Sequence, residues 1–286
     1  MTLRSAPVDD FSLAYDRSGS GPPVLLLHGW PGDRTDYRSV VPLLAERAEV
    51  IVPDFRGFGE SDKHDRPPLE AYTRDQQAAS VLALIDELGL EQPIVAGYDI
   101  GSRVAQVIAG SRPDVLRSLV LVPPLPGAGE RVFEPKILAE FWYQNFHNLE
   151  LPERLIDGNP DAVRTYLSHF WSHWSGPGYE LQDADLDHLV DVYSPPGAFT
   201  ASIAWYRARS GTLSRAREER PPAAEDRIHT RTTVLWPEHD PLFPQEWADV
   251  LEQWFSDVDV RLLDGVGHFV PLEAPRQLAD AILEQL

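Results

Sequence analysis

Short, wholly apolar segments recur along this chain, and most of them precede a segment with the residue spacing of an amphipathic helix. Apolar runs of this length, bounded by turn residues, are typical of strands that are buried on both faces of a sheet. The predicted strands, together with a half-exposed first one, are residues 11–16, 24–27, 50–52, 94–96, 116–122, 233–236 and 258–263. The predicted helices are residues 37–47, 76–88, 102–109 and 275–286. This alternation predicts an α/β fold, with a mostly parallel sheet flanked by helices on both faces.

The alternation stops between residues 123 and 228. This segment has no clear strand pattern, is rich in aromatic residues and is interrupted by Pro/Gly turns at residues 176–178 and 195–197. Such a composition favours helices that are broken by loops. We therefore expect a helical cap, residues 123–228, inserted into a core that consists of residues 1–122 and 229–286.

The composition narrows the classes of molecule that this chain can bind. The 286 residues carry a formal net charge of −20, which repels nucleic acid and anionic lipid surfaces. The chain has no cysteine, which excludes disulfides and thiolate metal sites and suits a reducing compartment. No apolar run approaches the roughly 20 residues that span a bilayer, and residues 1–10 include three charged side chains where a secretion signal is apolar. We expect a cytoplasmic monomer or homodimer that binds neither nucleic acid nor membranes.

The segment Gly97-Tyr98-Asp99-Ile100-Gly101 joins a predicted strand to a predicted helix. It places one polar side chain between small residues at a tight turn. This is the pattern of the nucleophile elbow, usually written G-x-S-x-G, with Asp99 in the position of the serine. A carboxylate that attacks carbon forms an alkyl ester, whereas a serine hydroxyl forms an acyl enzyme. Asp99 therefore predicts an enzyme that opens C–O or C–halogen bonds.

Asp240 and His268 each follow a later predicted strand. Sites in open α/β sheets form beyond the carboxyl ends of the strands, so we expect both residues to meet Asp99 there. The order nucleophile, acid, histidine is also the chain order of α/β-hydrolases. We predict that Asp99 is the nucleophile, that His268 is the general base, and that Asp240 holds the histidine tautomer and stabilises the imidazolium. Glu238 and Asp264 are rival candidates for the acid.

His28-Gly29-Trp30-Pro31-Gly32 follows the predicted strand at residues 24–27. Its glycines allow a sharp turn and leave backbone N–H groups free to point at the site. The N–H groups of Trp30 and of Ile100, the residue after the nucleophile, are predicted to form an oxyanion hole. The Trp30–Pro31 bond could be cis or trans, because an X–Pro bond pays little for the cis form.

Several motifs together give the chain a family resemblance. The segments at residues 28–32 and 53–59 and the aspartate elbow resemble the α/β-hydrolase-fold epoxide hydrolases of the bacterial soluble type. Trp142-Tyr143-Gln144 and Trp205-Tyr206-Arg207 are similar to the two cap segments that each place a tyrosine over the nucleophile in that family. The resemblance covers about residues 11–286. Tyr98 departs from it, since the family usually has histidine before the nucleophile.

The resemblance implies an α/β-hydrolase fold and a two-step reaction without cofactor or metal. Tyr143 and Tyr206 would donate a proton to the epoxide oxygen while Asp99 attacks a ring carbon, because an alkoxide needs an acid to leave. His268 would then activate the water that hydrolyses the ester, and the product would be a vicinal diol. The expected partner is a small-molecule epoxide. Tentative pocket residues are Phe141, Trp142 and Trp174, which would suit a bulky or aromatic substrate or could equally fill the core of the lid.

Two alternatives remain open. A haloalkane or haloacid dehalogenase would share the ester on Asp99. Haloacetate dehalogenases resemble the core closely, but they usually have arginine where this chain has Ile100, although Arg103 matches a second arginine of their pattern. Phe141 likewise occupies the position of the histidine in their halide-binding His-Trp pair. A non-catalytic member of the fold that binds a small ligand is the second alternative, against which the intact set of Asp99, Asp240 and His268 argues.

Overall fold

The computed structural model describes residues 2–286, so the first residue of the segments predicted at 1–10 and 1–122 lies outside it. The described residues form an eight-stranded sheet with the strand order β1-β2-β4-β3-β5-β6-β7-β8. The strands are β1 Leu3–Arg4, β2 Ala14–Gly19, β3 Pro23–Leu27, β4 Glu49–Pro53, β5 Ile94–Gly97, β6 Ser118–Leu121, β7 Thr232–Pro237 and β8 Val258–Leu263. The pairs β1–β2 and β2–β4 are antiparallel and all others are parallel. The predicted mostly parallel α/β sheet is therefore confirmed.

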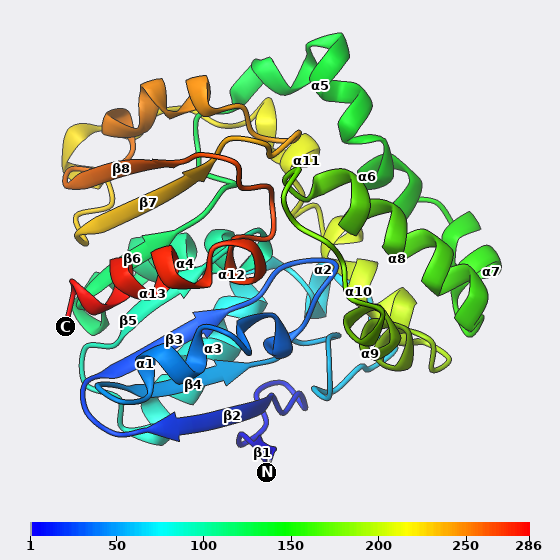
Figure 1. Cartoon of the computed structure of the whole chain (residues 1–286), viewed down its shortest axis with the longest axis horizontal. Coiled ribbons are helices and arrows are strands. Elements are labelled where there is room, and N and C mark those ends of the chain that lie inside the picture. The colour runs from blue at the N-terminus through cyan, green and yellow to red at the C-terminus, as the bar shows by residue number, and fades with distance from the viewer. Residues whose placement is uncertain (1) are drawn as a thin grey trace.

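Helices cover both faces of this sheet. The helices outside residues 123–228 are α1 Val41–Leu44, α2 Pro68–Ala71, α3 Arg74–Leu88, α4 Ile100–Ser111, α12 Val270–Glu273 and α13 Pro275–Leu283. Contacts join α1 to α13 and α3 to α4, so the two pairs form separate layers. Figure 1 shows α1 and α13 in front of the sheet, with α3 and α4 behind it. Short 3₁₀ helices complete the connections at η1 Arg34–Tyr37, η2 Pro113–Val115, η3 Gly129–Phe133, η4 Ala224–Asp226 and η5 Gln245–Gln253.

The prediction of one helix over residues 37–47 is wrong. The chain instead makes the 3₁₀ turn η1 and then the single-turn helix α1. The Tyr37 hydroxyl donates to the carbonyl of Leu27 on the neighbouring strand β3, at 2.7 Å. Pro42 lacks the N–H that a continuous helix would use at this point. A tertiary hydrogen bond and a missing donor thus divide what the apolar spacing alone predicts as one helix.

Residues 123–228, all of which are described, contain no strand and form a layer of helices. These helices are α5 Pro135–Glu140, α6 Trp142–His147, α7 Leu151–Ile156, α8 Pro160–Trp174, α9 Asp183–Tyr193, α10 Ala198–Arg207 and α11 Thr212–Ala216. Figure 1 shows them grouped beyond the carboxyl ends of the parallel strands. Buried hydrogen bonds fix them there: Trp171 Nε1 donates to the Pro31 carbonyl at 3.0 Å, and Tyr193 Oη donates to the Gly32 carbonyl at 2.7 Å. We use the word cap for this helical layer.

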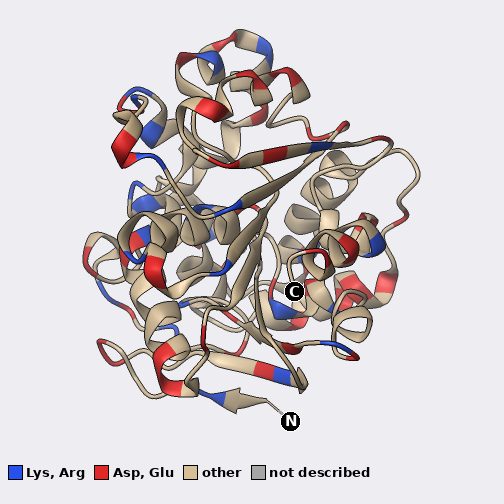
Figure 2. Cartoon of the chain, turned by 90° about the vertical axis from the view of Figure 1, so that its left-hand side faces the viewer, with Lys and Arg blue, Asp and Glu red and all other residues tan. Residues whose placement is uncertain are grey.

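Charge is concentrated outside the sheet. Figure 2 shows the acidic residues spread over outer helices and loops, while the central strands are largely uncharged. Strands β5, β6 and β7 are buried along their whole length, as the apolar sequence pattern predicts. Within residues 2–286, no helix combines the length and apolar character needed to cross a bilayer.

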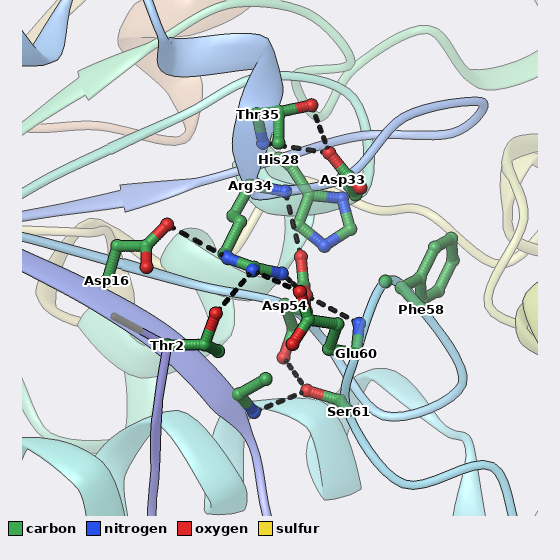
Figure 3. A network of polar contacts seen from close by, with 12 residues as sticks. Thr2, Asp16, His28, Asp33, Arg34, Thr35, Asp54, Phe58, Glu60 and Ser61 are labelled. Carbon is green, nitrogen blue, oxygen red and sulfur yellow. Dashed lines mark hydrogen bonds and ion pairs between the residues drawn. The ribbon is translucent and has the colours of Figure 1, made fainter. Parts of the chain in front are cut away.

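A buried ion pair anchors the loops at one end of the sheet (Figure 3). Asp54, directly after β4, is fully buried and accepts the backbone N–H groups of Arg34 and Glu60, each at 2.8 Å. The guanidinium of Arg34 pairs with the same carboxylate and also reaches Glu60 at 2.7 Å. Two loops that are distant in sequence are thereby held beside the segment that begins at His28.

Removing the Asp54 carboxylate should therefore be costly. Asp54→Ala leaves Nη1 of the buried Arg34 guanidinium and two backbone N–H groups without their acceptor, and breaking such a pair typically costs about 3–5 kcal/mol. Glu60→Gln is the matched control, because the Glu60 side chain is 60% exposed and its pair with Arg34 should contribute less than about 1 kcal/mol. Urea unfolding at constant m-value measures both changes. Equal losses in the two variants would contradict this account.

Candidate active site

The elbow at Asp99 is a strained turn between β5 and α4. Asp99 has φ 48° and ψ −119°, a conformation that costs a non-glycine residue on the order of 1–3 kcal/mol. The flanking glycines are needed for a close approach of backbone segments. A Cβ at Gly97 would lie 2.5 Å from the backbone of Gly101, and one at Gly101 would lie 2.0 Å from the carbonyl oxygen of Leu27. The turn therefore brings Asp99 out beyond the end of β5.

The neighbouring strand delivers the first partner of Asp99. Leu27 on β3 pairs with Gly97 on β5, so the segment that follows β3 leaves the sheet beside the elbow. The N–H of Trp30 donates to Asp99 Oδ1 at 2.8 Å. Burial raises the pKa of the Asp99 carboxyl, while the His268 charge and the N–H groups of Trp30 and Ile100 act in the opposite direction. The two amides predicted as an oxyanion hole thus face the carboxylate of the predicted nucleophile.

His28 gives that segment its shape. Its Nε2 accepts the N–H of Phe55 at 3.1 Å, which leaves the proton on Nδ1, where the Gly29 carbonyl accepts it at 2.9 Å. Burial lowers the pKa of His28, so this ring is neutral. Gly29 has no space for a side chain, because a Cβ would lie 2.6 Å from Cβ of Asp99. The Trp30–Pro31 bond, which the sequence left open, is cis.

His268 and Asp240 meet as the sequence predicts. His268 Nδ1 lies 2.9 Å from Asp240 Oδ2, and both side chains are fully buried. The other Asp240 oxygen accepts the N–H of Leu242 at 2.8 Å. Of the rival acids, Glu238 accepts the N–H of Gly265 and Asp264 is exposed. The geometry therefore favours Asp240 as the partner of the histidine.

The second ring nitrogen of His268 faces Asp99. Nε2 lies 3.7 Å from Asp99 Oδ2, which is too long for a direct hydrogen bond, and no atom of residues 2–286 bonds to it. Because Nδ1 carries its proton toward Asp240, Nε2 has a free lone pair. Burial alone would lower the pKa of His268, but the charge and hydrogen bond of Asp240 outweigh it, and the pKa is raised.

The cap places two phenols over the elbow. Tyr143 on α6 and Tyr206 on α10 line the same cavity as Asp99, with their ring centroids 5.6 Å apart. Tyr143 also stacks on Trp30 at a centroid distance of 5.6 Å. Burial raises the pKa of each tyrosine well above its usual value. Both hydroxyls are therefore protonated near neutral pH, and the structure brings the five predicted side chains together.

None of the three expected pocket residues lines the cavity. The expectation for Trp142 is wrong, because its side chain is 42% exposed and stacks on Phe170 outside the cavity. Successive helical residues point about 100° apart, so turning Tyr143 inward turns Trp142 outward. Phe141 and Trp174 are buried but do not line the cavity. Phe141 packs edge-on against Phe243. Trp174 packs against the ring of Tyr143 and the imidazole of His268.

Several residues around the cavity were not predicted as site residues. Gln144 Nε2 donates to the Tyr143 hydroxyl at 3.1 Å, and its Oε1 accepts the N–H of Leu213 at 3.0 Å. Arg103 lines the cavity one helical turn after Asp99 and pairs with Glu219, while its Nη2 has no partner among the described residues. Pro124, Trp205, Phe243 and the segment 210–212 also line the cavity. In the sequence, Gln144 is marked only by its place in the motif Trp142-Tyr143-Gln144.

Tyr98, the departure from the family pattern, lies below the site. It is fully buried, its hydroxyl donates to the carboxylate of Asp36, and its ring centroid lies 6.0 Å from that of His268. Burial raises the pKa of Tyr98 well above its usual value. The residue thus forms part of the support of the imidazole and does not line the cavity.

No metal site is evident in the described residues. Within residues 2–286, no cluster of three or more His, Cys, Asp or Glu side chains is arranged to hold a metal ion. His169 and His173 have the spacing of a ligand pair on α8, but Nε2 of His173 lies 2.6 Å from a carboxylate oxygen of Glu140.

The pairing of His268 with Asp240 predicts a pH dependence of stability. A histidine whose pKa is raised on folding adds stability that is fully present below the unfolded pKa, near 6.5, and is lost as the pH rises through the folded pKa. Asp240→Asn should lower the pKa of His268, and it should flatten the free energy of unfolding across this window. NMR titration of the imidazole and unfolding at several pH values measure both effects. Asp264→Asn, an exposed change nearby, should leave both unchanged, and an unshifted pKa in Asp240→Asn would contradict the pairing.

Comparison with known proteins identifies the fold family. Residues 22–275 match the family model described as the alpha/beta hydrolase fold. The soluble epoxide hydrolase of Corynebacterium sp. (strain C12) is 29% identical over 299 residues, which cover 99% of this chain and 96% of that protein. The solved structure of the epoxide hydrolase CorEH without ligand superposes with a TM-score of 0.84 at 26% identity, over 99% of this chain and 97% of that one. A fluoroacetate dehalogenase from a Burkholderia species is 29% identical over 73% of this chain and 69% of its own length. The chain therefore belongs to the α/β-hydrolase fold family, within which it is similar to epoxide hydrolases and also has dehalogenase relatives.

Proposed function

We propose that this chain is an epoxide hydrolase that converts an epoxide to a vicinal diol through a covalent ester on Asp99. The observation that carries the proposal is that two buried, protonated tyrosines line the same cavity as the Asp99 carboxylate. A nucleophile and an acid that line one cavity are what ring opening requires, because the alkoxide must be protonated as the C–O bond breaks. The similarity to the Corynebacterium epoxide hydrolase supports the same activity.

The first step is ring opening. The epoxide oxygen accepts hydrogen bonds from Tyr143 and Tyr206, and Asp99 Oδ2 attacks one ring carbon. Asp99 Oδ1 is held by the N–H of Trp30, so the second oxygen is the one that is free to attack. The C–O bond breaks toward the ring oxygen, which takes a proton from one tyrosine. The products of this step are a hydroxyalkyl ester on Asp99 and a tyrosinate.

The second step is hydrolysis of the ester. His268 Nε2, whose lone pair is free, takes a proton from a water molecule that attacks the ester carbonyl. The negative charge that develops on the carbonyl oxygen is stabilised by the N–H groups of Trp30 and Ile100. Collapse releases the diol, which takes the proton from His268, and the proton left on the Asp99 carboxyl restores the tyrosine. One water and one epoxide give one diol.

The cap leaves little free space beside Asp99. The cavity there has a free volume of about 10 Å³, roughly the space that one water molecule needs. Trp171 and Trp174 are buried in the cap and pack against protein, whereas Trp205 is buried and lines the cavity. For Trp174, filling the lid core is the one of the two roles left open by the sequence that we propose.

A dehalogenase that uses the same nucleophile is the second candidate. Arg103 supports it, because this guanidinium lines the cavity with an unpartnered Nη2 and could bind an anionic substrate. The Burkholderia fluoroacetate dehalogenase is a relative over part of the chain. Ile100 weakens it, since an aliphatic side chain after the nucleophile cannot bind a carboxylate. Halide release from haloacetates or haloalkanes, with no diol formed from epoxides, would favour this candidate over ours.

Replacing the base should trap the intermediate. His268→Gln keeps Asp99, Tyr143 and Tyr206, so the ester should form, while its hydrolysis should slow by about 10²–10⁴-fold. Mass spectrometry of the intact protein after mixing with an aryl epoxide should show one added epoxide, located on the peptide that contains Asp99. His169→Gln, a change on the cap helix α8, should show no adduct at steady state. An unmodified His268→Gln protein that still produces diol would contradict the proposal.

Replacing both phenols should block the first step. Tyr143→Phe combined with Tyr206→Phe removes the proton donors, so ester formation should slow by about 10²–10⁴-fold while the fold is kept. Tyr166→Phe is the matched control, because Tyr166 packs in the same aromatic cluster but hydrogen-bonds to His147 outside the cavity. Single-turnover ring opening and thermal unfolding give the two readouts. Ring opening at the normal rate in the double variant would rule out the tyrosines as the acid.

A further inference from the structure

Glu273, the last residue of α12, places one carboxylate among three backbone N–H groups. Its Oε2 accepts the N–H of Gly176 at 2.8 Å and that of Gly267 at 2.7 Å, and its Oε1 accepts the N–H of Phe269 at 3.0 Å. Gly267 and Phe269 are the two neighbours of His268, whereas Gly176 follows the cap helix α8. A single side chain therefore joins the loop of the histidine to the cap.

The same two segments also touch backbone to backbone. The N–H of His268 donates to the carbonyl of Trp174, the last residue of α8, at 2.8 Å. A Cβ at Gly267 would lie 2.3 Å from the nitrogen of Gly176 and 2.4 Å from the carbonyl oxygen of Trp174. Because no side chain fits between them, the end of α8 and the loop of the histidine dock in one register. The position of His268 thus depends on where the cap lies.

The chemistry of Glu273 suits a side chain that holds the cap and the loop of the histidine together, for which we use the word clamp. Burial raises the pKa of its carboxyl, and the N–H groups of Gly176, Gly267 and Phe269 act against that rise. A buried carboxylate is costly unless its oxygens accept hydrogen bonds, and hydrogen bonds to an ionised acceptor are stronger than neutral ones. The bond to Phe269 alone would be a local cap of the short helix α12. The two bonds on Oε2 reach beyond that helix and tie the cap to the histidine loop.

We propose that Glu273 is a positioning residue for hydrolysis of the ester, which aligns His268 through Gly267 and Phe269 while it holds the docked cap at Gly176. The inference rests on the proposed function, in which His268 activates the water. Ring opening uses Asp99 and the cap tyrosines and does not need the base. Because Glu273 holds the cap at the end of α8, whereas the two tyrosines lie on α6 and α10, we expect it to act mainly on the second step of the reaction.

Glu273→Gln tests this assignment, because the amide keeps the size of the side chain but replaces one acceptor oxygen with a donor. We expect ester hydrolysis in single turnover to slow by about 10–100-fold, since a misplacement of about 1 Å can cost roughly 10²-fold, while ring opening keeps nearly its normal rate. The charge of Glu273 raises the pKa of His268, so the acidic limb of ester hydrolysis should also move to lower pH.

Glu238→Gln is the matched control. Glu238 Oε2 accepts the N–H of Gly265 at 2.8 Å, so this carboxylate binds the same loop but does not reach the cap. Both chemical steps should keep their normal rates in this variant. A loss in Glu238→Gln as large as that in Glu273→Gln would show that any weakening of the loop suffices, and it would overturn the assignment.

Amide hydrogen exchange tests the clamp without a substrate. In Glu273→Gln, exchange should rise together in residues 174–176 and 265–269, whereas Glu238→Gln should affect only the surroundings of Gly265. Unchanged exchange at residues 174–176, or a slowing of both chemical steps in proportion to lost thermal stability, would overturn the proposal. If the unaltered protein forms no ester with epoxides, the proposed function fails, and the exchange result still decides whether Glu273 couples the cap to the histidine loop.

Discussion

The hydrogen bond from the Trp30 N–H to Asp99 Oδ1 is the contact on which the site depends. It exists because β3 and β5 are parallel neighbours, in a register that pairs Leu27 with Gly97, so that their carboxyl ends deliver two loops to one point. Gly29 and Gly101 let the loops approach to a distance that no Cβ would allow. Charge-assisted bonds of this kind favour the ionised carboxylate against the effect of burial. The core sheet thereby holds a reactive aspartate in a largely apolar environment.

The cap contributes the tyrosines of the site, whereas the sheet contributes the aspartates and the histidine. Strand ends position Asp99, Asp240 and His268, but the protonated phenols come from α6 and α10, which belong to the inserted helices. The end of α8 also carries the carbonyl that accepts the N–H of His268. Both steps of the proposed reaction therefore use groups from the core and from the cap. We infer that docking of the cap completes the acid for the first step and aligns the base for the second.

Sequence reasoning succeeded where a short local pattern has one structural outcome. Apolar strands that alternate with helices give a parallel sheet, and the carboxyl ends of such strands bring Asp99, Asp240 and His268 together although they are far apart in the chain. It failed where distant contacts decide. The helix predicted at residues 37–47 is divided because Tyr37 bonds to β3, and Trp142 faces outward because docking of α6 turns its neighbour inward.

For two supporting side chains, no sequence signal identifies the backbone group that each one binds. Glu273 binds the N–H of Gly176, 97 residues away, and Gln144 binds that of Leu213, 69 residues away. Backbone N–H groups are the same in every non-proline residue, so such partners leave no mark on residue type. The roles of the predicted site residues are proposals that rest on geometry, and the mechanism they form is open to direct measurement.

The most direct test is a single turnover with excess enzyme in ¹⁸O-labelled water, using a simple aryl epoxide such as styrene oxide. The account predicts that the label enters the Asp99 carboxylate and is absent from the first diol, because the oxygen added to the ring comes from the aspartate and water replaces it afterwards. Label that appears directly in the first diol would mean that water attacks the ring, and it would contradict the assignment of Asp99 as the nucleophile.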